Sequence, residues 1–169
     1  MGILIKPVDS EKEISTVAAL ANTIWNEHYV PIIGQAQIDY MLEKFQSKEA
    51  ISTQIREEKT EYYLLYTALV PVSYFSIIEK PGEMFLSKLY VLASERRKGF
   101  GCIAINFLLS RCRAKSLEYM TLTVNKNNHV AIKSYEKMGF EKYGEVVTDI
   151  GSGYVMDDYM MRLTVEPNI

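Results

Sequence analysis

The chain is poor in the residues that build disulfide-linked and metal-linked proteins. Its 169 residues include two cysteines, Cys102 and Cys112, and two histidines, His28 and His129. Ten residues along one helix would place the two cysteines ~15 Å apart, which excludes a disulfide between them. No C-x-x-C pair or other zinc-ligand spacing occurs, so no metal is expected. This composition predicts a protein of a reducing compartment.

Long apolar runs and an excess of one charge are also missing. No uninterrupted apolar stretch approaches the ~18 residues of a membrane-spanning helix. The opening segment MGILIKPVDS has neither the basic region nor the apolar region of a signal peptide. We therefore expect a cytoplasmic protein with no membrane partner. Nineteen basic and 21 acidic residues give a net charge of −2, which argues against a nucleic-acid partner.

What remains is an ordinary globular composition, with 48% apolar residues, 9 glycines and 5 prolines. The length predicts a single domain over residues 1–169. Hydrophobic periodicity predicts helices near residues 10–26, 35–45, 47–58, 99–114 and 127–138, with a loop over 27–34. The segment Ser10-Glu11-Lys12-Glu13 resembles a capping box, and Gly139 is expected to close the last helix as a left-handed cap. Strand formers gather at residues 3–8, 61–66, 72–78, 85–92, 119–124 and 154–165, with a further strand starting at Phe140 and turns at Pro71 and Pro81–Gly82. The expected fold class is α+β (or α/β) with a mixed central sheet.

The segment with the clearest chemistry joins an expected strand to an expected helix. Three cations, Arg96, Arg97 and Lys98, precede the sequence Gly99-Phe100-Gly101. Two glycines let the backbone come close to a ligand, and the unpaired amides of a first helical turn favour an anion. The neighbouring cations add positive potential. The segment therefore predicts a site for a phosphate or pyrophosphate.

Two other phosphate-binding patterns are alternatives for this segment. The Walker A pattern is absent, whereas residues 99–104 satisfy G-x-G-x-x-A, the dinucleotide fingerprint of a nicotinamide-dependent oxidoreductase. In that fold the glycine turn follows its strand at once, but seven residues separate Val91 from Gly99. The acid Glu118 also precedes the next strand instead of ending it. The context therefore disfavours a dinucleotide site.

Two ordered blocks resemble the GNAT superfamily of acyl-CoA-dependent N-acetyltransferases. Residues Arg96 to Gly101 match every fixed position of its signature, which is Gln or Arg, then x-x-Gly-x, then Gly or Ala. The second block resembles the family pattern N-x-x-A-i-x-x-Y-e-k-x-G-F through Asn128, Ala131, Ile132, Tyr135, Met138, Gly139 and Phe140. One expected helix and one expected strand lie between the blocks, as in the family.

The resemblance implies a sheet of about seven strands flanked by about four helices, with acetyl-CoA as co-substrate and no metal. It also implies a cofactor-binding set made of Leu89, Val91, Arg96, Arg97, Lys98, Gly99, Phe100, Gly101 and Asn128. In the family the loop amides bind pyrophosphate, and the strand backbone pairs with the pantetheine arm. A tyrosine at the position of Tyr135 commonly protonates the leaving thiolate, and a phenol with an ordinary pKa of ~10 can do so. Taken alone, Tyr135 could instead be a packing residue and Asn128 a helix cap.

These expectations combine into an N-acetyltransferase that moves an acetyl group from acetyl-CoA to the amine of a small acceptor. Direct attack in a ternary complex is favoured because no activated nucleophile is visible. The alternative is a catalytically silent CoA-binding regulatory module. The acceptor would lie near Trp25 to Tyr29, with Glu27 or His28 as a candidate base, or near Asp157-Asp158. At most one of these two aspartates can face the site, since neighbours on a strand point opposite ways. A homodimer is an open alternative.

Overall fold

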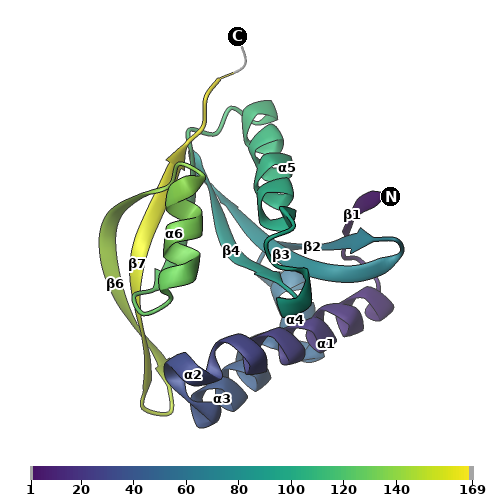
Figure 1. Cartoon of the computed structure of the whole chain (residues 1–169), viewed down its shortest axis with the longest axis vertical. Helices are drawn as coiled ribbons and strands as arrows, with labels where there is room; N and C mark the ends of the chain where they lie inside the picture. Colours follow the sequence, from purple (N-terminus) through teal and green to yellow (C-terminus); the bar gives the residue numbers. More distant parts are fainter. Residues whose placement is uncertain (1, 168–169) are drawn as a thin grey trace. The chain divides into compact units, whose positions relative to one another are not determined.

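The computed structural model describes residues 2–167, and among them it has seven strands, six α-helices and one 3-10 helix. Figure 1 labels the elements. The helices are α1 (Glu11–His28), α2 (Val30–Ile33), α3 (Gln35–Gln46), α4 (Lys48–Glu57), α5 (Phe100–Ala114) and α6 (His129–Lys137). The strands are β1 (Ile3–Pro7), β2 (Thr60–Thr67), β3 (Val70–Lys80), β4 (Glu83–Val91), β5 (Tyr119–Asn125), β6 (Glu141–Gly151) and β7 (Tyr154–Thr164). None of the helices in residues 2–167 is long and apolar enough to cross a membrane.

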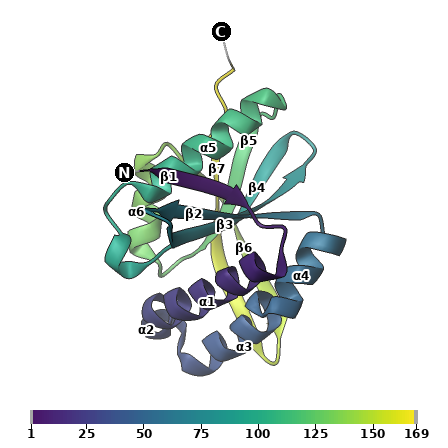
Figure 2. The ribbon, with the colours of Figure 1, turned by 90° about the vertical axis from the view of Figure 1, so that its right-hand side faces the viewer.

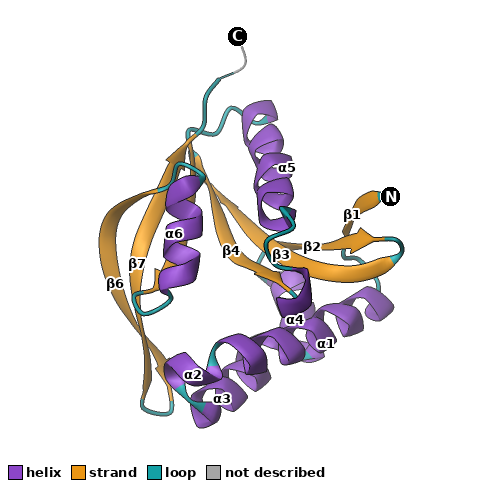
Figure 3. Ribbon diagram, in the orientation of Figure 1, coloured by secondary structure: helices purple, strands orange, loops and turns teal. Residues whose placement is uncertain are grey.

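The strands, which are orange in Figure 3, form one mixed sheet. Their order in the sheet is β1-β2-β3-β4-β5-β7-β6. Strand β4 pairs in parallel with β5, where Glu83 to Phe85 lie opposite Tyr119 to Thr121. The pairs β1–β2, β2–β3, β5–β7 and β6–β7 are antiparallel. The α+β class and the mixed sheet of about seven strands are therefore confirmed.

Residues 27–34 are not the loop that the sequence predicts. Helix α1 continues to His28, and the short helix α2 occupies Val30–Ile33. Pro31 lies in the first turn of α2, where a missing amide hydrogen costs no intrahelical bond. Gly34 then ends α2 with a positive φ of 86°. Proline and glycine act here as the start and stop of a helix and not as loop residues.

The turn expected at Pro71 lies a little earlier in the chain. Ala68 and Leu69 have φ values of 49° and 67° and make a two-residue turn of the kind that suits a hairpin. Pro71 itself belongs to β3, opposite Tyr66, where the register between β2 and β3 shifts. A bulge tolerates proline because the regular ladder is interrupted there.

The chain divides into two compact units. Unit 1 comprises Met1–Ile78 and Lys88–Ile105, and unit 2 comprises Glu79–Ser87 and Asn106–Ile169. In unit 1, helices α1, α3 and α4 pack against one another (Figure 2), and the core includes the fully buried Ile24, Ile38, Leu64 and Phe75. A single domain over residues 1–169 stays a prediction.

Unit 2 is organised around the long hairpin β6–β7, and β7 also pairs with β5. Its core includes Met84, Leu108, Cys112, Met120 and Met161. Both cysteines lie on α5 as free thiols, with Cys112 buried and Cys102 exposed. Strand β6 extends to Gly151, although the sequence predicts only its beginning at Phe140, because most of its side chains are exposed and carry no apolar alternation.

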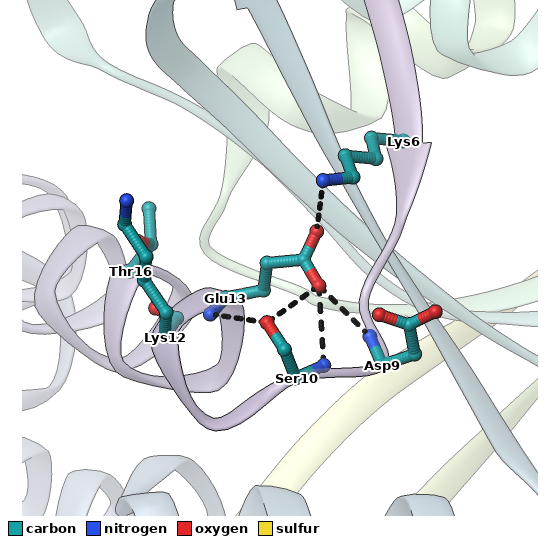
Figure 4. Close-up of polar contacts among 6 residues, drawn as sticks. All are labelled: Lys6, Asp9, Ser10, Lys12, Glu13 and Thr16. Carbon is teal, nitrogen blue, oxygen red and sulfur yellow. Dashed lines mark hydrogen bonds and ion pairs between the residues drawn. The ribbon is translucent and has the colours of Figure 1, made fainter.

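The start of α1 is fixed by a capping box that the sequence predicts (Figure 4). The Ser10 hydroxyl accepts a hydrogen bond from the Glu13 amide at 3.2 Å, while Glu13 Oε1 accepts from the Ser10 amide at 3.1 Å. Glu13 Oε1 also accepts from the Ser10 hydroxyl at 2.8 Å and from the Asp9 amide at 3.2 Å. Lys6 Nζ lies 3.1 Å from Glu13 Oε2. Burial alone would raise the pKa of Glu13, but these partners outweigh it and lower that pKa to about 2.

The substitution Ser10→Ala is expected to lower the free energy of unfolding by about 1 kcal/mol at pH 7. Since the folded pKa of Glu13 is depressed, its contribution is present above its ordinary pKa and is lost as the pH falls toward about 2. The variant loses one of the bonds that hold the pKa down, so acid unfolding should begin at higher pH. Urea titrations across pH measure both effects. Thr16→Ala, on the same helix, is the control, and equal losses in both variants would contradict the role of the box.

Candidate functional site

The loop between β4 and α5 has the backbone of an anion site. Strand β4 ends at Val91, and the 3-10 helix Ala93–Glu95 intervenes before the loop. Arg97 and Gly99 have positive φ values of 64° and 88° on either side of Lys98. Alternation of this kind turns successive amides toward one concave side, which attracts anions. The 3-10 helix also distinguishes this connection from the immediate glycine turn of a dinucleotide-binding fold.

Helix α5 extends this anion site. Its first bond runs from the Ile103 amide to the Gly99 carbonyl at 3.0 Å, so the amides of the first turn have no intrahelical acceptor. A Cβ placed on Gly99 would meet no atom within 4 Å, which leaves the space beside the loop open. Phe100 is only 7% exposed, so its backbone and not its ring can face a ligand there. The loop therefore fits a pyrophosphate by its amides.

The three cations of the loop have different surroundings. All three are exposed. Arg96 Nε donates to the Val91 carbonyl at 3.3 Å, and Lys98 Nζ lies 3.0 Å from Glu95 Oε2. Within the described part of the chain, the side chain of Arg97 has no hydrogen bond or ion pair. Arg96 and Lys98 therefore hold the loop, while the guanidinium of Arg97 is available to an anion.

The backbone amide and carbonyl groups of two β4 residues are directed away from β3. The Tyr90 carbonyl accepts from Ser73 Oγ at 2.7 Å, and the Leu92 amide donates to the Val72 carbonyl at 2.9 Å. Backbone groups alternate in direction along a strand, so those of Leu89 and Val91 point to the opposite edge. This is the orientation that pairing with an extended pantetheine arm requires.

An aromatic cluster in unit 1 surrounds Tyr90. The Trp25 ring and the Tyr74 ring each have their centroid 5.5 Å from that of Tyr90. Trp25 Nε1 donates to the Tyr74 hydroxyl at 3.0 Å, and that hydroxyl donates to Gln46 Oε1 at 2.7 Å. Burial raises the pKa of Tyr74 well above its ordinary value. Trp25, at 3% exposed, is therefore a core residue that forms the buried part of the cluster.

Tyr29 and Tyr90 are the half-exposed members of this cluster. Their hydroxyl oxygens are 3.5 Å apart, and their ring centroids are 6.0 Å apart. The sequence indicates Tyr29 but not Tyr90, although a tyrosine between Leu89 and Val91 lies at the point of the strand where their backbone groups are directed away from β3. The other candidates of α1 differ: Glu27 is exposed, and the His28 ring packs edge-on against Tyr29 at 4.8 Å.

Unit 2 carries the second sequence block. Asn128 caps α6, because its Oδ1 accepts from the Ala131 amide at 3.4 Å, and the residue is only 4% exposed. Gly139 ends this segment with φ of 103°, and a Cβ there would lie 3.0 Å from Leu163 Cδ1. Tyr135 is half-buried, and its ring meets that of Phe140 edge-on at 5.4 Å. The alternative that Asn128 is a helix cap is therefore confirmed, while its part in cofactor binding and the role of Tyr135 stay predictions.

The two neighbouring aspartates on β7 face opposite ways, as the sequence predicts. Asp157 lies 2.9 Å from Lys126 Nζ, and its side chain is 53% exposed. Lys126 also lies 3.3 Å from Glu145. Asp158 is only 3% exposed. Burial first, and the charge of Asp157 second, raise the pKa of Asp158 to about 6, against the opposing effect of Lys126.

Comparison with known proteins agrees with these features. The sequence profile of the Acetyltransferase (GNAT) family matches residues 21–140. The GCN5-related N-acetyltransferase 6, chloroplastic, of Arabidopsis thaliana is 30% identical over 82 residues, which are 47% of this chain and 27% of that protein. The L-methionine sulfoximine/L-methionine sulfone acetyltransferase of Pseudomonas aeruginosa is 30% identical over 81 residues, 47% of this chain and 46% of that protein. The chain thus aligns with less than half the length of these curated relatives.

Solved structures show the same fold. The PaiA N-acetyltransferase from Thermoplasma acidophilum, in complex with coenzyme A, has a TM-score of 0.82 at 19% identity, covering 97% of this chain and 99% of its own. The ribosomal-protein-S18-alanine N-acetyltransferase from Escherichia coli has a TM-score of 0.73 at 14% identity, covering 99% and 97%. These identities support the fold alone. The profile match, by contrast, spans both sequence blocks and most of the 169 residues, so the chain belongs to the GNAT acetyltransferase family.

Proposed function

We propose that the protein transfers an acetyl group from acetyl-CoA to the amine of a small acceptor. The observation that carries this proposal is the loop of residues 96–101, where two positive φ angles and a helix N-terminus gather amides beside an open space. Membership of the GNAT acetyltransferase family and the likeness to a coenzyme A complex support it.

In this proposal each part of the site has one task. The amides of Lys98 to Cys102 bind the pyrophosphate, and Arg97 adds positive charge. The outward backbone of Leu89 and Val91 pairs with the pantetheine arm and orients the thioester. Asn128 fixes the first turn of α6, the helix that carries Tyr135.

The reaction is a direct displacement in a ternary complex. The neutral amine attacks the thioester carbonyl, a carbon–nitrogen bond forms, and the carbon–sulfur bond then breaks. Tyr135 supplies the proton that the departing sulfur needs, and a base removes the proton that the nitrogen loses. No covalent acyl-enzyme is required. We further propose that the protein acts in the cytoplasm, as a homodimer and without a metal. Dialysis against a chelator should therefore leave turnover unchanged.

The acceptor in this proposal is a small amine that carries a second positive charge. Tyr29 and Tyr90 are half-exposed aromatic residues, and a cation over the face of an aromatic ring gains ~0.5–2 kcal/mol. The exposed carboxylate of Glu27 lies two residues before Tyr29 and adds negative charge nearby. A polyamine or an amino sugar has this chemistry, whereas nucleic acid and membranes do not.

Tyr90→Leu is expected to raise KM for such an amine by about tenfold, the equivalent of ~1.4 kcal/mol, because the ring face is lost. The KM for acetyl-CoA should stay unchanged. Steady-state kinetics at saturating co-substrate measure both constants. Tyr66→Leu, on β2, is the matched control. An unchanged amine KM in the Tyr90 variant, or turnover of neutral acceptors only, would contradict a cationic acceptor.

The experiment that tests the function itself is a screen for release of free thiol from acetyl-CoA. Polyamines, amino acids, aminoglycosides and peptide N-termini are the acceptors, and the acetylated product is identified by mass spectrometry. We expect steady release with at least one small amine. Tight binding of acetyl-CoA without turnover of any amine would favour the catalytically silent CoA-binding module instead.

A further inference from the structure

Two carboxylates are buried in the described part of the chain, and their surroundings differ. Glu13 has hydrogen bonds from Ser10 and from the Asp9 amide, together with the Lys6 ammonium. The side chain of Asp158, a residue that is only 3% exposed, has no hydrogen bond or ion pair with any residue between 2 and 167. An unpaired carboxylate is costly to bury, so its partner is expected to come from outside the chain.

The position of Asp158 places it beside the second sequence block. On β7 it lies between Asn125 of β5 and Val146 of β6. Asn125 is the last residue of β5, and its carbonyl accepts from the Asn128 amide at 2.9 Å. Asn128 in turn caps the helix that carries Tyr135. In α/β sheets, ligands bind at the carboxyl ends of parallel strands, and the end of β5 is such a place.

The charges that face Asp158 are few. Asp157 raises the pKa of Asp158, and Lys126 lowers it, after the larger effect of burial. Lys126 is shared with Asp157 and Glu145, so its charge is largely balanced by these two acids. With a pKa of about 6, Asp158 is mostly ionised at pH 7 and remains a stronger base than an ordinary carboxylate.

We propose that Asp158 is the general base that receives the proton of the acceptor amine. This inference rests on the proposed acetyl transfer. The acceptor enters as an ammonium, which forms the missing ion pair with the buried carboxylate. As the proton passes from nitrogen to a carboxylate oxygen of Asp158, the nitrogen lone pair forms the bond to the acetyl carbon. The carbon–sulfur bond then breaks, and the sulfur leaves with that electron pair and takes a proton from Tyr135. The nitrogen loses its second proton, which restores Tyr135, and Asp158 releases its own proton to solvent, so one proton is released in each turnover.

The test compares Asp158→Asn with Asp157→Asn. Both variants replace a carboxylate by its amide at neighbouring positions, but only the first removes the buried one. We expect kcat/KM for the best amine to fall ~10²–10⁴-fold in Asp158→Asn, with acetyl-CoA affinity by calorimetry unchanged. Asp157→Asn should keep the plateau rate. Unaltered calorimetric binding also shows that the variant is folded.

The pH profile separates a base from a structural residue. In the wild type, kcat/KM should rise with pH through an apparent pKa near 6, because the base must be ionised. Asp158→Asn should lose this acidic limb. Asp157→Asn removes a charge that raises the pKa and should move the limb to lower pH, whereas Lys126→Met should move it to higher pH.

The outcomes are distinguishable. If the wild type releases no thiol with any amine, the proposed function fails and the base has no reaction. If the wild type turns over and Asp158→Asn keeps both its rate and its acidic limb, the assignment of Asp158 is wrong. A higher amine KM with an intact limb would also overturn it, since Asp158 would then bind the ammonium without accepting its proton.

Discussion

Gly99→Val and Gly101→Val are expected to weaken acetyl-CoA binding by about 100-fold. A hydrogen bond to a charged group contributes ~1.5–3 kcal/mol, so the loss of even one or two amide contacts with the pyrophosphate produces this change. At Gly99 the new side chain would enter the open space beside the loop, where no protein atom lies within 4 Å. Isothermal titration with acetyl-CoA measures the affinity.

Backbone strain needs its own control, because Gly99 has φ of 88° and valine is disfavoured there. Gly34 has φ of 86° and also has open space around its Cα, so Gly34→Val places a valine at a similar positive φ away from the loop. It should leave acetyl-CoA affinity unchanged. Gly101 lies within α5, so its replacement tests the approach of the ligand without a positive φ. Wild-type affinity in both loop variants would exclude the loop as the pyrophosphate site.

Tyr135→Phe is expected to lower kcat by ~10²–10⁴-fold at pH 7 while the affinity for acetyl-CoA stays the same. The variant keeps the ring, and with it the edge-on contact with Phe140, so the fold should be preserved. Only the hydroxyl that is proposed to protonate the thiolate is removed. Stopped-flow or steady-state thiol release measures the rate.

Tyr143→Phe is the matched control for Tyr135. Tyr143 lies on β6, is 41% exposed, and packs on the guanidinium of Arg162. The same chemical change there should leave kcat unaltered. Wild-type kcat in Tyr135→Phe would mean that this ring only packs against Phe140 and that the thiolate receives its proton from another group.

The features that sequence alone predicts well are those with local causes. The capping box at Ser10, the cap at Asn128 and the positive φ of Gly139 each depend on residues a few positions apart. The loop of residues 96–101 also has a local cause, because glycines and a following apolar helix are enough to indicate an anion site, and binding of an anion there stays a prediction.

The features that sequence misses have distant causes. Trp25 is a core residue because its indole nitrogen donates to Tyr74, 49 positions away. The burial of Asp158 depends on the order β5-β7-β6, which places a late strand between two earlier ones. Most of strand β6 is not predicted, because exposed strands carry no apolar alternation. Helix α2 is not predicted, because proline and glycine, here Pro31 and Gly34, also occur in loops. Periodicity reports a residue's own element and not the elements that pack against it.

Because Trp25 lies in unit 1, its intrinsic fluorescence can be used to follow that unit. It is the one tryptophan of the 169 residues, and the rings of Tyr29 and Tyr90 lie 5.8 Å and 5.5 Å from it. Its emission therefore reports the surroundings of α1 and β4, whereas backbone circular dichroism averages both units. Coincident denaturation curves from the two signals would show that the units melt as one cooperative body. Because the half-exposed rings of Tyr29 and Tyr90 lie against the buried indole, an amine that binds on these rings should also change the emission, which would give acceptor affinity without a label.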